Sequence, residues 1–158
     1  MTLKNSIENG FAKYWFESGQ IQSNGQYING KQDGAWTYLQ LNGAWTIRTY
    51  KNGRLNGLTK EHLIDSIDGI IIAIGQFQDG KETGVWKWFD KDSILYQTAT
   101  YVDGRYFGEY KRFYKSGLVK LSGSLNGEDT RDGEFIFFDT MGKLSKKEYW
   151  KEGKRLNK

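Results

Sequence analysis

The chain lacks proline and cysteine altogether and has a single histidine, His62, among its 158 residues. Average usage would put about eight prolines in a chain of this length, so their absence indicates that most backbone N–H groups are needed in β-sheet hydrogen bonds. Without cysteine the chain has no disulfide framework and no thiolate chemistry. One histidine and no cysteine cannot supply the usual zinc ligands, so we expect no metal and no cofactor.

Long apolar runs are also missing. The longest, residues 70–74, is far shorter than the roughly 20 residues needed to span a bilayer. Residues 1–9 are polar and contain no apolar segment of the kind found in secretory signals. We therefore expect a cytoplasmic protein without stable membrane insertion.

Charge is distributed unevenly along the chain, whose formal net charge is +4. The last 16 residues hold seven basic and two acidic side chains, and the other 142 residues carry a net charge of −1. A nearly neutral body argues against a nucleic-acid-binding surface. The basic residues of the last strand are also of the kind that keeps a sheet edge from pairing with another molecule.

Glycine and aromatic residues are abundant instead, with 20 Gly, 6 Trp, 10 Tyr and 9 Phe. This aromatic content excludes an intrinsically disordered chain, and the length indicates one domain, residues 1–158. Glycines that precede aromatic-rich segments recur every 23 to 27 residues, at Gly10, Gly34, Gly57, Gly84, Gly108 and Gly133. They divide the chain into an N-terminal cap, 1–9, and six units, 10–33, 34–56, 57–83, 84–107, 108–132 and 133–158.

Residue types within each unit alternate with the period of a β-strand. In three of the six units aromatic residues stand both two and four positions after the opening glycine, as Trp36 and Tyr38 do after Gly34. A small turn-forming residue follows nine positions after that glycine, and another glycine stands near the end of the unit; we assign all these glycines to turns with positive φ. The prediction is an all-β fold, an elongated, twisted antiparallel meander sheet built from six β-hairpin repeats of about 24 residues.

Equivalent residues of successive units should form columns on the two faces of this sheet. One face would carry the aromatic column Trp36, Trp86, Tyr110 and Phe135, and the other the lysine column Lys13, Lys60, Lys87 and Lys111. The aromatic column is first of all a core, and the lysine column a solvated face. A single-layer sheet cannot bury both faces, however, so part of the aromatic column should be exposed as a contact surface for a protein.

Three junctions between units share the pattern aromatic-x-x-Gly-(Lys/Arg)-x-x-Gly-x-aromatic, and they run from Tyr27 to Trp36, from Phe77 to Trp86 and from Tyr101 to Tyr110. In these segments the chain resembles the bacterial variant of the MORN repeat found in the YwqK-type antitoxin and immunity family. The unit that begins at Gly57 departs from the pattern, with Thr59 and Glu61 where aromatic residues are expected and three additional residues.

The resemblance implies an antitoxin or immunity protein, a non-enzymatic module that binds a cognate toxin and occludes its active site. The alternative is a structural MORN-repeat scaffold that self-associates or binds a membrane surface. A wall-binding repeat of the choline-binding kind is also rich in Trp, Tyr and Gly, but it is disfavoured by the absence of an export signal. We expect a monomer or a weak homo-oligomer.

The candidate partner-binding residues come from both predicted columns and their neighbours. They are Trp36, Tyr38, Trp86, Trp88, Tyr110, Lys87, Lys111 and Arg112. No catalytic residue is predicted, because Glu61 and His62 are adjacent in a strand and therefore point to opposite faces. Ser66 nearby completes only a loose Ser/His/Asp set, with none of the spacing of a nucleophile elbow.

Overall fold

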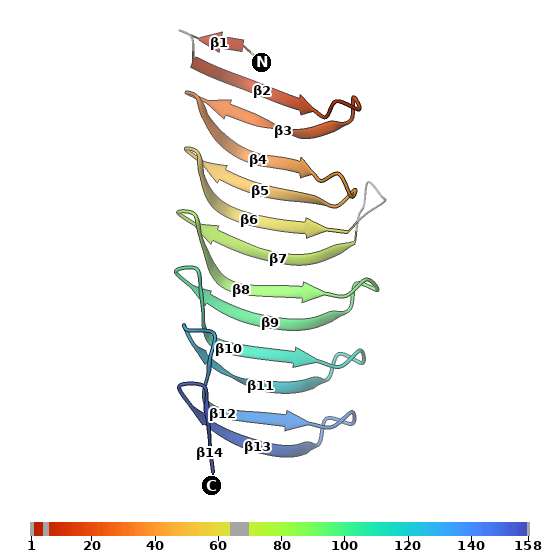
Figure 1. Cartoon of the computed structure of the whole chain (residues 1–158), viewed down its shortest axis with the longest axis vertical. Helices are drawn as coiled ribbons and strands as arrows, with labels where there is room; N and C mark the ends of the chain where they lie inside the picture. The colour runs from red at the N-terminus through yellow and green to blue at the C-terminus, as the bar shows by residue number, and fades with distance from the viewer. Residues whose placement is uncertain (1, 5–6, 64–69, 158) are drawn as a thin grey trace. The chain divides into compact units, whose positions relative to one another are not determined.

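The computed structural model describes residues 2–4, 7–63 and 70–157, and every regular element in these ranges is a β-strand. The chain divides into two compact units, Met1–Lys81 and Glu82–Lys158. In Figure 1 the strands of each unit follow one another in chain order and their turns alternate between two sides. Ser66 and the additional residues of the unit that begins at Gly57 lie largely outside the described ranges.

The first unit contains seven strands, each paired antiparallel with the next. They are β1 (Thr2–Lys4), β2 (Ile7–Trp15), β3 (Ile21–Ile28), β4 (Lys31–Leu39), β5 (Trp45–Lys51), β6 (Arg54–His62) and β7 (Ile71–Gln78). The predicted cap, residues 1–9, holds β1 and the first residues of β2. The boundary between the units follows the first residue of β8 (Lys81–Phe89).

The second unit repeats this arrangement. After β8 come β9 (Leu95–Val102), β10 (Arg105–Phe113), β11 (Val119–Asn126), β12 (Arg131–Phe138), β13 (Leu144–Lys151) and β14 (Lys154–Leu156), again paired antiparallel in order. The predicted all-β meander of antiparallel hairpin repeats is therefore confirmed within each unit. That the two units make one domain stays a prediction.

Two-residue turns close one set of hairpins. Asn29 and Gly30, between β3 and β4, both have positive φ, 50° and 75°, as a type I′ turn requires. The same pairing of positive φ values occurs at Asn52–Gly53, Asp79–Gly80, Asp103–Gly104 and Glu152–Gly153. These are the predicted turns near the ends of the units, and their geometry suits the right-handed twist of the strands.

The opening glycines of the repeats differ from the prediction. Gly34 was assigned to a turn, but it lies inside β4, with a φ of 75°. The segment from Asp33 to Thr37 on β4 is opposite the shorter segment from Asn24 to Gln26 on β3, so β4 bulges at this point. The positive φ is what a bulge demands of its glycine, and a spacing pattern cannot distinguish it from a turn.

Each two-residue turn is hydrogen-bonded to the preceding repeat. The Gly30 N–H donates to the Glu8 carbonyl at 2.9 Å, and the Gly53 N–H donates to the Gln32 carbonyl at 2.8 Å. The residue before the opening glycine adds a side-chain acceptor, since Asn9 Oδ1 receives the Asn29 N–H at 2.9 Å. Equivalent backbone bonds join Gly80 to Leu55, Gly104 to Glu82 and Gly153 to Arg131.

The core depends on aromatic rings that lie over glycines. Trp36 is only 1% exposed, and its indole ring contacts Gly25 of the neighbouring strand β3. A Cβ on Gly25 would collide with the Trp36 indole, so the ring lies directly over the glycine backbone. The indole Nε1 donates to the Gln26 carbonyl at 3.0 Å. A single layer can therefore bury a Trp by using the adjacent strand as its cover.

The same packing of a ring over a glycine recurs in the second unit, and one hairpin of the first unit has the opposite arrangement. Phe135 on β12 is 0% exposed and lies over Gly123 of β11. In the hairpin of β5 and β6 the larger side chain is on the first strand, because Arg48 on β5 stands opposite the small Thr59 on β6. The irregular Thr59 is thus opposite a long side chain, at the position where Gly25 and Gly123 lie under a ring in their hairpins.

Substitution of Gly25 by alanine tests this packing. Gly25→Ala should lower the free energy of unfolding by about 1 to 3 kcal/mol, the usual cost of overpacking a core, because the new methyl group collides with the Trp36 ring. Urea unfolding followed by tryptophan fluorescence measures the change. Asn24→Ala is the matched control, since Asn24 is adjacent on β3 and points to the other face. An equal loss in both variants would contradict the packing described.

Candidate functional site

A cluster of five aromatic residues occupies one face of the first unit. Its centre is Trp36, whose ring centroid lies 5.0 Å from that of Tyr27, 6.1 Å from Tyr38 and 6.4 Å from Tyr14. Tyr38 is in turn 6.4 Å from Tyr50. These distances are those of favourable stacked and edge-to-face pairs. We call Tyr14, Tyr27, Trp36, Tyr38 and Tyr50 the first aromatic cluster.

Hydrogen bonds between phenol groups hold this cluster. The Tyr14 hydroxyl donates to that of Tyr27 at 3.3 Å, and the Tyr38 hydroxyl donates to that of Tyr50 at 3.1 Å. Gln32 Nε2 donates to the Tyr38 hydroxyl at 2.8 Å. The tyrosines therefore have fixed orientations, so little conformational entropy remains to be lost when a partner binds.

The same contacts raise the pKa values of the tyrosines. The hydrogen bond with Tyr14, aided by burial, raises the pKa of Tyr27 to about 12. Burial, followed by the hydrogen bond with Tyr50, raises the pKa of Tyr38. Both phenol groups are thus neutral in the physiological range, and the charge beside the cluster is that of Arg48, whose guanidinium carbon lies 5.7 Å from the centroid of the Tyr38 ring.

The second unit has a corresponding cluster, which we call the second aromatic cluster: Trp86, Trp88, Tyr101, Tyr106 and Tyr110. Tyr101 and Tyr106 lie 4.3 Å apart between ring centroids, and Trp86 and Trp88 lie 6.2 Å apart. Tyr101 contacts both indoles, at 5.7 and 6.3 Å. Burial, with a hydrogen bond to Tyr106, raises the pKa of Tyr101. The Tyr110 hydroxyl is anchored to Gln97 Oε1 at 3.3 Å.

The eight predicted contact residues are not all accessible from one side. Trp36 and Trp86 are only 1% and 6% exposed. They therefore lie beneath the surface residues and are not themselves available for contact. The half-buried residues Tyr38, Trp88 and Tyr110 keep ring edges at the surface, and Arg112 is exposed. That any of them contacts a partner stays a prediction.

Lys87 and Lys111 lie on the opposite face of the second unit, since they alternate with Trp86, Trp88 and Tyr110 along β8 and β10. Lys87 is exposed, and Lys111 forms an ion pair with Glu109 at 2.6 Å. One flat partner could therefore not contact both lysines and the aromatic residues at once. Sequence reasoning combined two faces into one candidate site.

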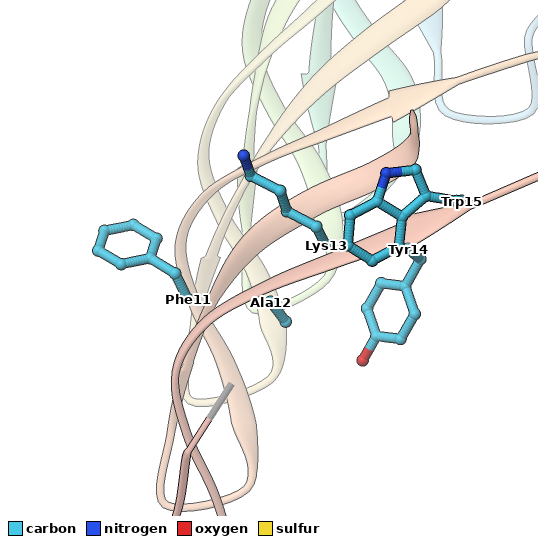
Figure 2. A pocket seen from close by; sticks show the side chains of 5 residues that line it. All are labelled: Phe11, Ala12, Lys13, Tyr14 and Trp15. Atoms are coloured by element: carbon cyan, nitrogen blue, oxygen red, sulfur yellow. The ribbon is translucent and has the colours of Figure 1, made fainter. Parts of the chain in front are cut away.

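The same alternation is visible on β2. Figure 2 shows Lys13 and Tyr14 leaving the strand on opposite sides, around a hollow of about 350 Å³ lined by Phe11, Ala12, Lys13, Tyr14 and Trp15. Five consecutive residues of one strand cannot enclose a ligand, because they alternate between its faces. We therefore assign no small-molecule site to this hollow.

His62 is a buried residue that packs against an aromatic ring. It is 6% exposed and stacks on Trp45 with ring centroids 3.6 Å apart and planes 9° from parallel. Within residues 2–4, 7–63 and 70–157, no group of three or more His, Cys, Asp or Glu side chains is arranged to hold a metal ion. In the same ranges no helix is long and apolar enough to cross a membrane.

A basic group that sequence reasoning did not single out lies at the far end of the second unit. Arg131 has its guanidinium carbon 4.8 Å from the ring centroids of both Phe135 and Trp150, and Lys146 Nζ is 4.4 Å from that of Phe137. Arg131, Lys146 and Trp150 contact Glu148, which is 6% exposed and is paired with Phe135 across the strands. The only sequence signal was the charge surplus of the last unit, which indicates neither the face nor the contacts.

Comparison with protein families identifies two segments. Residues 8–29 and 82–103 match the model described as the MORN repeat variant. This supports a MORN-repeat protein. The matched segments are structurally equivalent, because each contains an even-numbered strand, its turn, the following strand and the first residue of a two-residue turn. MORN repeats indicate a protein-binding or scaffold module. A comparison with curated proteins gives no match.

Alkaline pH should destabilise the fold through these tyrosines. A tyrosine in the unfolded chain has a pKa of about 10, whereas that of Tyr27 in the folded protein is about 12. The unfolded state therefore loses its proton first, and the free energy of unfolding falls from pH 10 upward until the folded phenols also ionise. Unfolding by urea between pH 8 and 12, with tyrosinate absorbance recorded in parallel, measures this.

Tyr27→Phe is the control for this prediction. It removes the hydroxyl without removing the ring, so the loss of stability between pH 10 and 12 should become smaller in this variant. An unchanged pH dependence of the free energy of unfolding in Tyr27→Phe would show that ionisation of the Tyr27 phenol does not contribute to it.

Proposed function

We propose that this chain is a non-enzymatic antitoxin or immunity protein, which binds a cognate bacterial toxin in the cytoplasm and occludes its active site. The observation that carries the proposal is the pre-oriented aromatic cluster of each unit; the segments that match the MORN repeat variant, residues 8–29 and 82–103, supply part of each cluster. Occlusion needs a broad, rigid contact surface and no reactive group, and a repeat sheet provides such a surface.

The aromatic face is favoured over the lysine face as the contact surface. Trp88 and Tyr110 are half-buried and sit against rigid neighbours, and Trp, Tyr and Arg dominate the binding energy of protein interfaces. Arg112 is two residues after Tyr110 on β10 and therefore lies on the same face of the sheet. Lys111 is already paired with Glu109, and an exposed ion pair of this kind contributes little to affinity.

Co-purification with the product of the neighbouring gene, followed by growth rescue of cells that express it, tests the proposal. Trp88→Ala and Tyr110→Ala should each weaken toxin binding by about tenfold or more, as truncation of an aromatic anchor does. Lys87→Ala is the matched control, because Lys87 is adjacent to Trp88 but on the opposite face. Circular dichroism verifies that each variant is folded. If no neighbour-encoded product binds or is neutralised, the proposal is wrong.

A scaffold that self-associates is the second candidate, and exposed apolar side chains on β2 favour it. Phe11 and Trp15 are 76% and 57% exposed, more than a solvated sheet face needs. For the proposed antitoxin, light scattering should give a concentration-independent monomer. A mass that rises with concentration and returns to that of a monomer in Phe11→Ser/Trp15→Ser would favour the scaffold.

A further inference from the structure

Three cations converge on one buried carboxylate on the aromatic face of the second unit. Glu148 accepts a hydrogen bond from Lys146 Nζ at 2.8 Å and lies 3.4 Å from Arg131 and 3.7 Å from Arg155. The Trp150 indole Nε1 donates to it at 3.2 Å. The carboxylate thus holds three basic side chains from β12, β13 and β14 together.

Glu148 remains charged at neutral pH. Lys146, and to a smaller extent Arg155 and Trp150, hold the pKa of Glu148 below its usual value against the opposing effect of burial. A buried carboxylate is tolerated only with such partners. It supplies a single negative charge, however, and this leaves two of the three surrounding positive charges uncompensated.

A fourth cation lies in line with this group. The pairing of β10 to β13 places Arg112 opposite Leu121, Leu121 opposite Phe137, and Phe137 opposite Lys146. At about 4.8 Å between strands, this row extends roughly 14 Å from Arg112 to Lys146. We call Arg112, Arg131, Phe137, Lys146, Trp150 and Arg155 the basic–aromatic patch.

On this face the basic side chains outnumber the carboxylates that they contact. Among the described residues, no carboxylate lies within ion-pair distance of Arg112, and Arg131, Lys146 and Arg155 share Glu148 alone. On the opposite face of the same strands, Lys147 has its own carboxylate in Glu134 at 2.9 Å, and Lys111 has its own in Glu109 at 2.6 Å. Arg131 and Lys146 also lie over aromatic rings, those of Trp150 and Phe137.

We propose that the basic–aromatic patch binds an acidic protein segment, whose Asp or Glu side chains supply the missing negative charges. This inference rests on the proposed function in taking the partner to be a protein. Lys146 and Arg155 have side chains 54% and 60% exposed, so carboxylates of a partner can reach them. An acidic protein is favoured over a nucleic acid because the remainder of the chain is nearly neutral and would not follow an extended phosphate backbone.

Fluorescence anisotropy with a labelled decapeptide of alternating Glu and Ser tests the patch in the intact chain. Lys146→Gln/Arg155→Gln should weaken binding by about tenfold, because two of the free charges are lost. Lys147→Gln/Lys154→Gln is the matched control: it removes the same charge from the neighbouring positions on β13 and β14 and should leave affinity within about twofold. Equal weakening by both double variants overturns the inference.

Two further probes decide the class of partner. The same peptide with Gln in place of Glu should not bind, and equal binding of this neutral peptide overturns the inference. Tighter binding of a single-stranded DNA decamer than of the acidic peptide also overturns it, in favour of a nucleic-acid surface.

The outcome is separable from that of the proposed function. A neighbour-encoded toxin that binds Lys146→Gln/Arg155→Gln as tightly as the unaltered chain overturns the acidic-segment inference and leaves the antitoxin proposal standing. Specific binding of the acidic peptide without any toxin partner supports the patch and overturns the antitoxin proposal.

Discussion

The contact on which the rest of the structure depends is an aromatic ring lying over a glycine of the adjacent strand. Trp36 over Gly25 and Phe135 over Gly123 are buried almost completely, although neither unit has a second layer of secondary structure among its described residues. Because the glycine has no side chain, the ring reaches the backbone and is covered on its edges by neighbouring rings. Burial of this kind supplies a hydrophobic core within one layer.

This way of building a core also determines what the surface can do. The rings that close over Trp36 are tyrosines, and their hydroxyl groups bond to one another instead of remaining free. The surface is therefore rigid and amphipathic before any partner arrives. Binding to such a surface costs little ordering entropy, which is the physical basis for proposing that it serves recognition.

Cations and carboxylates are arranged differently on the two faces of the second unit. On the lysine face, Lys147 and Glu134 neutralise each other as a pair, and so do Lys111 and Glu109. On the aromatic face three cations contact the single carboxylate of Glu148. This carboxylate is buried away from water, and a buried carboxylate is retained only with close partners. The result is a local excess of positive charge held over apolar rings, a surface suited to carboxylates of a partner.

By itself, the sequence determined the strands, the hairpin turns and the repeat, because alternation and glycine spacing are local properties of the chain. It also predicted two chemically distinct faces, but it placed Gly34 in a turn and grouped Lys87 with Trp86 in one site. Only the tertiary structure showed that the Trp36 ring lies over Gly25, and that Arg131, Lys146 and Arg155 converge on Glu148. Those contacts join different strands, and their register is set by bulges and turns whose effect no single segment reveals.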